Sequence, residues 1–564
     1  MLLKKLTRKK AVGRSTHDAE EPHHIGMAKV LSVRDLTFFG IAAIIGAGIF
    51  SSIGSACFAG GPAVIFLFII CAVACGFTAM CYAEFASRVP MSGSAYTYAY
   101  VSFGELFAWI IGWALLMEYS IGNIYVAFSW SGYFTNLLGA FNVHIPAWLA
   151  INYTEAHDAF LSKTAGLGMD AWNSAPLIGN LHVIFDLPAV GINILITWLV
   201  LVGVKESKNV SNIMVIIKLA IIVLVIGVGV FYVNIDNWHP FMPNGFTGVM
   251  AGVASVFFAF IGFDAVSTLA EECKNPQRDL PRGMIYSLLI STVIFVVLAL
   301  ILTGMVSYTK LNVGDPLAEI FALKGMKWML FIVSISAVVA MTSVILVFQM
   351  GQPRIWMTMS RDGLMPKRFS AIHPKYKTPA FSTIVTGLVV GVPIFFTDRN
   401  FILDFTSIGT LFAFTLVCGG VLVLPHRTKE ETIGKFSLPY VNAKFIVPAI
   451  VLVSFALIFI FNKDFFMHTF GISPEQDPVT GKDVPYNAVK NIPMIAFLII
   501  CLIMSALSFI KNYSLIPVLG FLSCIYLFTG FNVANWKWFF LWMIIGLVIY
   551  FFYGFRKSRL NTTA

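Results

Sequence analysis

The sequence predicts an all-α polytopic membrane protein with about 14 transmembrane helices. Three observations support this fold class. Hydrophobic residues make up 58% of the 564 residues, charged residues make up only 12%, and apolar runs of bilayer-crossing length recur along the chain. The first ten helices are expected to form a core of two inverted repeats, five-plus-five, and the last four to lie outside it.

The expected spans cover residues 38–59, 62–86, 103–133, 188–204, 213–233, 246–269, 284–306, 329–350, 381–396, 402–424, 445–461, 492–509, 515–528 and 536–553. They divide the chain into a cytoplasmic N-terminal segment (1–36), a first repeat (37–233) with a long outer loop (136–187), a second repeat (246–424), additional spans (445–555) and a cytoplasmic tail (556–564).

Basic residues orient the chain. With a cytoplasmic N-terminus, 28 of the 38 Lys and Arg residues fall in cytoplasmic segments, 9 in outer segments and one, Lys218, inside a span. Because cytoplasmic loops carry the excess of basic residues, both termini are expected in the cytoplasm and the protein in the plasma (inner) membrane. The net charge of +10 is then a topology signal, and no nucleic-acid partner is expected. The polar start of the chain lacks a signal-peptide cleavage pattern, so the first span is expected to be retained.

The first span carries a glycine-rich interruption, with Gly46 and Gly48 on either side of Ala47. Glycine is a poor helix former, and a broken helix within a bilayer is tolerated only beside protein or a water-filled cavity. We therefore expect the helix to open here and to offer its freed backbone groups to a ligand. Close packing of small residues against another helix is the alternative.

A second interruption, Gly262 beside Asp264, falls in the sixth span. Paired broken helices at corresponding positions of two halves indicate a transporter binding site. Because each half holds an odd number of spans, the second half is expected to be inverted relative to the first. Coincidence is the alternative, since glycine is common in membrane helices.

Three motifs, in order, resemble the amino acid–polyamine–organocation (APC) superfamily. They are RDLT with IGAGIF within residues 34–50, FAFIGFD with EECKNPQRDLPRG within residues 258–283, and SRDGLMP at residues 360–366. The resemblance covers about residues 31–424. Fourteen expected spans and Glu118 in the third make the chain most similar to bacterial members of the cationic amino acid transporter family. It implies a LeuT-like core and transport of L-amino acids. The long outer loop departs from the compact bacterial pattern.

The interruptions and the resemblance together indicate a substrate site. The expected substrate-binding residues are Ile44, Gly46, Ala47, Gly48, Phe258, Ala259, Phe260 and Ile261. Amides of the first interruption, at a half-helix N-terminus, would bind the substrate carboxylate, and carbonyls of the sixth span its ammonium. Phe258 is expected to close over the substrate. Specificity is expected from Met341, Thr342 and Ser343 in the eighth span.

Glu118 lies near the middle of the third span, about 22 Å of helix from either end. An acid at this depth is costly, so it calls for a specific role. We expect it to face a substrate ammonium, directly or through water, or to bind a proton. A structural acid satisfied by neighbouring helices is the alternative.

Lys218 lies about a third of the way into the fifth span, and Asp264 ends the interruption in the sixth. Resemblance to proton-coupled members implies that Lys218 links its span to the opened backbone of the first, near the position where sodium-coupled relatives hold Na⁺. Snorkelling to the interface is the alternative. Asp264 is expected to join a proton path or to cap a half-helix N-terminus, where negative charge is favoured.

We therefore expect a secondary active transporter of L-amino acids, with cationic ones as candidates, working by proton-coupled symport or exchange through alternating access. A non-transporting amino acid sensor on the same fold and an amino acid/polyamine antiporter are the alternatives. A lipid-directed membrane enzyme would need a reactive constellation that the sequence lacks, so no catalytic residue, metal or cofactor is expected.

The expected partners are the L-amino acid substrate, H⁺ and the lipid bilayer. A small single-span membrane protein or a bound lipid is a further candidate partner. Two further patterns lie near the expected inner face. Tyr96, Tyr98 and Tyr100 fit an interfacial aromatic belt, and the charged residues within 271–282 fit an inner-face salt-bridge network.

Overall fold

A computed structural model of the chain describes residues 6–10, 29–46, 48–179, 181–313, 316–397, 399–425, 435–461, 463–472, 475–476, 483–484, 488–531 and 533–561. This part of the chain is largely helical. Its main helices are α3 (Val33–Ile44), α4 (Ile53–Gly60), α5 (Val64–Arg88), α6 (Ala95–Ser102), α7 (Glu105–Ala140), α10 (Leu187–Val202), α11 (Val204–Val230), α12 (Gly245–Ala251), α13 (Val253–Phe260), α14 (Pro276–Met305), α15 (Pro316–Leu323), α16 (Lys327–Arg361), α17 (Ala380–Gly391), α18 (Arg399–Val423), α19 (Ile446–Phe461), α20 (Lys463–Thr469), α21 (Ala488–Lys511), α22 (Leu515–Phe528), α23 (Val533–Ile549) and α24 (Phe555–Lys557).

Nine helical stretches within the described ranges are long and apolar enough to cross a membrane, and four shorter apolar helices accompany them. The shorter ones, which include α10, α17, α19 and α22, lie over the expected spans 4, 9, 11 and 13. The expected sixth span is divided among α12, α13 and the 3-10 helix η5 (Phe263–Glu272), because it is interrupted at Gly252 and Gly262. These lengths and compositions are those of a helical multi-pass membrane protein.

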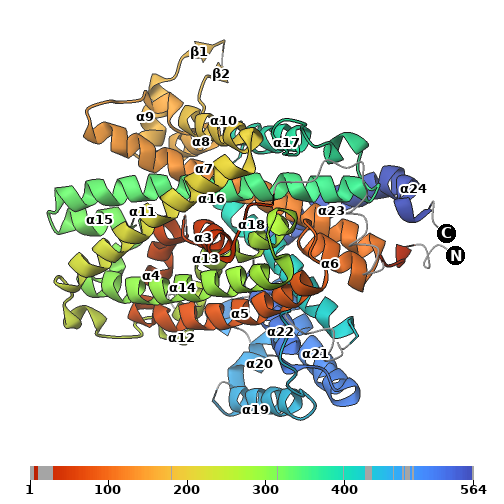
Figure 1. The fold of residues 1–564 in the computed structure, drawn as a ribbon. Helices are drawn as coiled ribbons and strands as arrows, with labels where there is room; N and C mark the ends of the chain where they lie inside the picture. The colour runs from red at the N-terminus through yellow and green to blue at the C-terminus, as the bar shows by residue number, and fades with distance from the viewer. Residues whose placement is uncertain are drawn as a thin grey trace.

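The helix α3 lies at the centre of the molecule, between α16 on one side and α14 on the other (Figure 1). It begins with a capping box, in which the side chains of Ser32 and Asp35 bond each other's backbone amides. Asn212 of α11 also donates to Asp35 at 2.8 Å, so α11 holds the start of α3 in place. The long helices α7 and α16 pack along each other, and α7 also packs on α18.

The long outer loop predicted at residues 136–187 is itself folded. It contains α8 (Tyr153–Ser162), α9 (Leu167–Ser174) and a hairpin of β1 (Leu177–Ile178) and β2 (Leu181–His182), which project from the top of the molecule in Figure 1. Trp172 stacks on His182 with ring centroids 4.0 Å apart and on Phe160 at 5.2 Å. This aromatic cluster joins the hairpin to α8 and α9.

The last helices attach to the core on two sides. Tryptophans join α23 to α7: Trp113 Nε1 donates to the Trp542 carbonyl at 2.9 Å, and Trp542 Nε1 donates to the Trp113 carbonyl at 3.1 Å. On the other side, α22 packs on α18 and α5, and α19, α20 and α21 lie beyond it (Figure 1).

The expectation of an interfacial belt at Tyr96, Tyr98 and Tyr100 is wrong. All three side chains are at most 1% exposed, because α6 packs inside the molecule against α7 and α18. The Tyr96 hydroxyl donates to Asp362 and the Tyr100 hydroxyl donates to Glu105. Tyr96 and Tyr100 therefore satisfy buried carboxylates, and Tyr98 stacks on Phe85 with ring centroids 4.8 Å apart, so none of the three marks the edge of the bilayer.

A candidate substrate site at two broken helices

The first broken helix opens at the glycines that the sequence singles out. The helix α3 ends at Ile44, and the chain restarts at Gly48 as a π-helix, η1 (Gly48–Ser52), which continues into α4. The Gly46 carbonyl accepts from the amides of Ile49 and Phe50, each at 3.1 Å. Ala47 lies outside the described residues. The C-terminus of one half-helix therefore faces the N-terminus of the next, and their free backbone groups differ in sign.

The second broken helix lies directly against the first. The helix α13 ends at Phe260, Gly262 adopts a left-handed φ of 115°, and η5 continues from Phe263. A Cβ added at Gly262 would lie 2.6 Å from the Ala43 Cβ. A Cβ added at Gly48 would lie 2.4 Å from the Ala259 Cα. Only glycine permits this approach, so the two openings meet with no side chain between them.

A small cavity of about 10 Å³ lies between the two openings. Its wall consists of Ala43, Ile44, Gly48, Val126, Phe258, Ile261, Val344 and Phe348. This volume is at the lower limit for one water molecule, so an amino acid can enter only when the surrounding helices move apart. The structure therefore shows the site in a closed form.

Four of the expected substrate-binding residues line this cavity, namely Ile44, Gly48, Phe258 and Ile261. Ala259 lies behind Gly48, and Gly46 lies against Val344. The Phe260 ring packs instead on Phe68 and Phe295, with ring centroids 6.3 and 5.1 Å away, which keeps it out of the cavity wall.

Four wall residues were missed by sequence reasoning: Ala43 of α3, Val126 of α7, and Val344 and Phe348 of α16. Helical periodicity offers a signal for them, because Val344 and Phe348 are four residues apart and so share one helix face. Identifying the facing helix, however, requires the three-dimensional packing.

The residues expected to set specificity are buried, but they do not line the cavity. Thr342 accepts a hydrogen bond from Trp130 Nε1 at 2.8 Å, and Ser343 donates to the Ala340 carbonyl at 2.6 Å. Met341 is fully buried. In this closed form, the residues of α16 that line the cavity are Val344 and Phe348.

Lys218 is completely buried, and its ammonium is bound to the open end of α3. Its Nζ donates to the carbonyls of Ile41 and Ala42 at 3.1 Å each and to the carbonyl of Ile45 at 2.7 Å. A fourth bond reaches Ser343 Oγ at 3.0 Å. Carbonyls at a helix C-terminus lack intrahelical partners and favour a cation. The ammonium therefore satisfies the C-terminal end of the broken helix, and it does not snorkel.

Two buried carboxylates lie close to the second opening. The Tyr119 hydroxyl donates to Asp264 Oδ2 at 3.2 Å, and both Asp264 and Glu118 are completely buried. In the described part of the chain, no hydrogen bond within 3.5 Å reaches either oxygen of Glu118 or Oδ1 of Asp264, although Thr410 is a polar neighbour of Glu118. Unpaired buried carboxylate oxygens are costly, so these two acids are candidates for binding a proton or a cation.

Contacts close the site on the side that the sequence predicts to face outward. The Tyr133 hydroxyl donates to the Phe50 carbonyl at 2.5 Å, which joins α7 to η1. Ser52 Oγ donates to the Ser255 carbonyl at 3.1 Å, so η1 and α13 of the two broken helices are also joined.

Contacts close it on the side predicted to face the cytoplasm as well. Arg354 Nε donates to Glu272 Oε1 at 2.8 Å, and Arg361 pairs with Glu271 at 2.8 Å. The inner-face network expected within residues 271–282 therefore draws its basic partners from α16. Arg354, which is 1% exposed, shows that Lys218 is not the only basic residue held inside the molecule.

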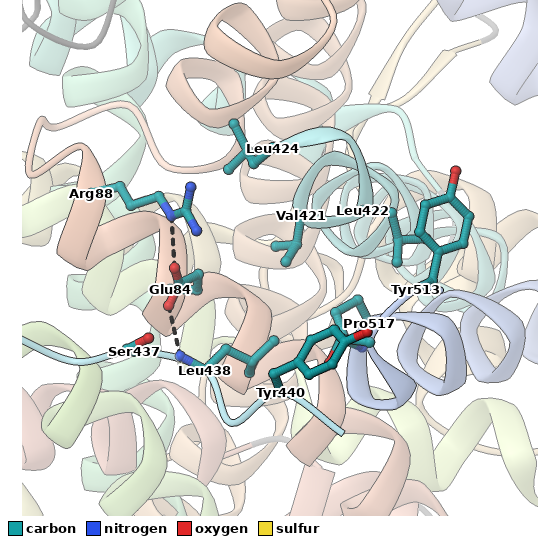
Figure 2. Close-up of a pocket in the computed structure, with 11 residues that line it drawn as sticks. Glu84, Arg88, Val421, Leu422, Leu424, Ser437, Leu438, Tyr440, Tyr513 and Pro517 are labelled. Carbon is teal, nitrogen blue, oxygen red and sulfur yellow. Dashed lines mark hydrogen bonds and ion pairs between the residues drawn. The ribbon is translucent and has the colours of Figure 1, made fainter. Parts of the chain in front are cut away.

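A larger cavity, of about 440 Å³, lies away from the broken helices, between the ends of α5 and α18 and the start of α22 (Figure 2). Its charged groups satisfy each other: Glu84 accepts from Arg88 Nε at 2.6 Å and from the Leu438 amide at 2.8 Å. Its walls come from the ends of separate helices and not from two broken helices that meet, so we place the candidate site at the broken helices.

Comparisons with known proteins agree on a single family. The profile of the amino acid permease family matches residues 31–498, and that of the permease C-terminus matches residues 513–558. The chain is 36% identical to the branched-chain amino acid permease BcaP of Bacillus subtilis, over 95% of each protein. It is 43% identical to the methylthioribose transporter of the same organism, over 75% of this chain and 87% of that protein. It is 36% identical to the vacuolar cationic amino acid transporter 4 of Arabidopsis thaliana, over 72% of this chain and 64% of that protein. The chain belongs to the amino acid permease family, within the APC superfamily.

Proposed function

We propose that this protein is a secondary active transporter of L-amino acids in the cell membrane, with both termini in the cytoplasm. Its core would consist of two inverted five-helix repeats, residues 37–233 and 246–424, and residues 445–555 would add four helices to reach about fourteen spans. The pairing of two broken helices at a central, closed cavity supports alternating access in this family.

The substrate backbone would bind between the two openings. Its carboxylate would meet the N-terminus that begins at Gly48, where helix amides favour an anion. Its ammonium would meet the carbonyls at the C-terminal end of α13, around Phe258, Ala259 and Ile261. Movement of Phe258, which lines the cavity, would admit or enclose the substrate.

For the side chain, we propose a neutral aliphatic group. The cavity walls that would meet it, Val126, Val344 and Phe348, are apolar. Glu118 is eight residues before Val126 on α7, about 12 Å along the helix, which is beyond the reach of a lysine side chain without bridging water. Cationic amino acids, which relatives of this chain are named for transporting, are the second candidate class.

For coupling, we propose that protons or exchange replace sodium. The observation that carries this proposal is the Lys218 ammonium bound by three carbonyls at the end of α3. A fixed positive charge there both satisfies the carbonyls and repels a metal cation. Glu118 and Asp264 are then the candidate acids for a transported proton.

The test is uptake by purified protein in proteoliposomes, with Na⁺ replaced by choline and a pH gradient imposed across the membrane. A panel of unlabelled amino acids, with methylthioribose and a polyamine added, would compete against labelled leucine. We expect accumulation with an acidic outer side and competition by neutral aliphatic amino acids. Binding without uptake would indicate a sensor, and uptake only against internal polyamine would indicate an antiporter.

A further inference from the structure

The start of the described chain, residues 6–10, is bound into the inner side of the molecule. The Glu105 amide donates to the Arg8 carbonyl at 3.1 Å. Gly104, with φ 103°, lies against the Thr7 backbone so closely that a Cβ there would be 2.6 Å from the Thr7 carbonyl carbon. The segment therefore occupies a fitted groove at the turn between α6 and α7.

A buried carboxylate anchors the segment through Arg8. Glu105 is fully buried and accepts from Arg8 Nε at 2.9 Å and Nη2 at 3.0 Å. It also accepts from the Tyr550 hydroxyl at 3.0 Å and from Ser558 Oγ at 2.5 Å. Because these donors belong to the end of the chain, Glu105 binds the two ends of the protein together.

A second anchor, through Lys10, reaches α16. The Lys10 ammonium donates to Asp362 Oδ1 at 2.9 Å, and the lysine is only 9% exposed. The Tyr96 hydroxyl of α6 donates to the other oxygen, Oδ2, at 2.8 Å. Lys10 and Tyr96 thus share one carboxylate, which fixes α6 against the end of α16.

This anchored segment adjoins the contacts that close the inner face. Ser92, just before α6, accepts from the Glu271 amide through its hydroxyl at 3.2 Å, and its carbonyl accepts from the Thr358 hydroxyl. Thr358 lies one helical turn before Asp362 on α16. Holding Tyr96 against Asp362 therefore also holds Ser92 between α16 and the inner end of η5.

Farther along the chain, residues 30–31 bind the end of η5. The amides of Val30 and Leu31 donate to the Glu272 carbonyl at 2.9 and 3.0 Å, and the Lys274 amide donates back to the Leu31 carbonyl at 3.0 Å. Residues 6–10 are thus attached to the end of α16, and residues 30–31 to the inner half of the second broken helix.

We propose that residues 6–10 form a clasp that stabilises the form closed toward the cytoplasm, so that releasing Lys10 from Asp362 favours opening there. The inference rests on the proposed transport function, because only alternating access requires the inner end of η5 to separate from α16. It adds an autoinhibitory contact to that function and assigns roles to Arg8, Lys10, Glu105 and Asp362.

The neighbouring lysine offers a matched control. Lys9 is exposed, so Lys9→Met and Lys10→Met remove the same charge from adjacent positions. Hydrogen–deuterium exchange of the full-length protein in lipid nanodiscs would follow residues 89–102 and 263–275. We expect Lys10→Met to speed exchange there about tenfold or more, the effect of losing one charged hydrogen bond. Lys9→Met and Lys10→Arg should match the wild type.

Equal exchange in Lys10→Met and Lys9→Met would overturn the clasp. A uniform rise that extends to residues 116–130 of α7 would also count against it, because it would show general loosening. Tyr96→Phe, which removes only the hydroxyl that reaches Asp362, provides a second variant and should raise exchange in the same two segments. Because exchange needs no transport, uptake assays on the same preparations test the proposed function separately.

Discussion

The Lys218 ammonium donates to the Ile45 carbonyl at 2.7 Å, which places a lysine from the fifth expected span on the last carbonyl before the first helix opens. A charged lysine within a membrane helix costs roughly 2.5 to 3.5 kcal/mol on insertion scales. Four oxygens within 3.1 Å of Lys218 Nζ share its three N–H donors, and these hydrogen bonds offset much of that cost. The broken helix and the buried lysine therefore stabilise each other.

Replacing Gly48 with alanine should abolish substrate uptake. The added Cβ would lie 2.4 Å from the Ala259 Cα, so the two broken helices must separate, at a cost of about 1–3 kcal/mol of stability. Gly132→Ala is the control, because a Cβ there meets nothing within 4 Å. Uptake and thermal unfolding in detergent would check both variants. Wild-type uptake by Gly48→Ala would exclude this close approach from the working site.

Shortening Val344 should widen the side-chain preference. Val344→Ala removes two methyl groups from the cavity wall, so uptake of leucine relative to alanine should rise about tenfold. Val338→Ala, which lies on the same helix but away from the cavity, should leave that ratio unchanged. Competition kinetics with both amino acids would measure the ratio. An unchanged ratio in Val344→Ala would show that another wall sets specificity.

Neutralising Glu118 should separate coupling from binding. Glu118→Gln keeps the shape of the side chain but cannot carry a proton, so accumulation driven by a pH gradient should fall. Leucine binding and leucine exchange should persist, because Glu118 does not line the cavity. Asp264→Asn provides a parallel test of the second acid. If both variants accumulate leucine like the wild type, neither acid carries the proton.

The inner ion pairs should differ strongly in their contribution to stability. Arg354→Met leaves Glu272 buried without its partner, which should cost about 3–5 kcal/mol. Arg361→Met breaks a pair whose side chains are 27% and 15% exposed, so the loss should be about 1 kcal/mol or less. Thermal unfolding of the two variants would compare these losses, and equal losses would contradict the assignment of the buried pair.

The sequence could predict the two broken helices because glycine within an apolar span weakens the helix at that position. It could also single out Lys218 and Glu118, because a charged residue inside an apolar span is rare and can be recognised from the sequence alone. The bonds from Lys218 to α3 follow from a resemblance, and the structure supplies their geometry.

Contacts between distant helices could not be predicted in the same way. Phe260 and Ile261 are adjacent in an apolar run, yet only Ile261 lines the cavity, because Gly262 and the extended Ile261 redirect the chain. Tyr96 fits a membrane belt by composition, but its partner Asp362 is 266 residues away. Such pairs depend on helix packing, which hydropathy does not encode.

The most direct test of the account is leucine accumulation by Lys218→Met in sodium-free proteoliposomes under an imposed pH gradient. Lys208→Met is the control, because Lys208 lies on the same helix with 22% of its side chain exposed and makes only a long ion pair, of 3.8 Å, with Asp35. We predict that the wild type and Lys208→Met accumulate leucine without Na⁺, whereas Lys218→Met binds leucine but does not accumulate it. Strict dependence of the wild type on Na⁺, or full accumulation by Lys218→Met, would contradict the proposal that this lysine takes the place of a coupling cation.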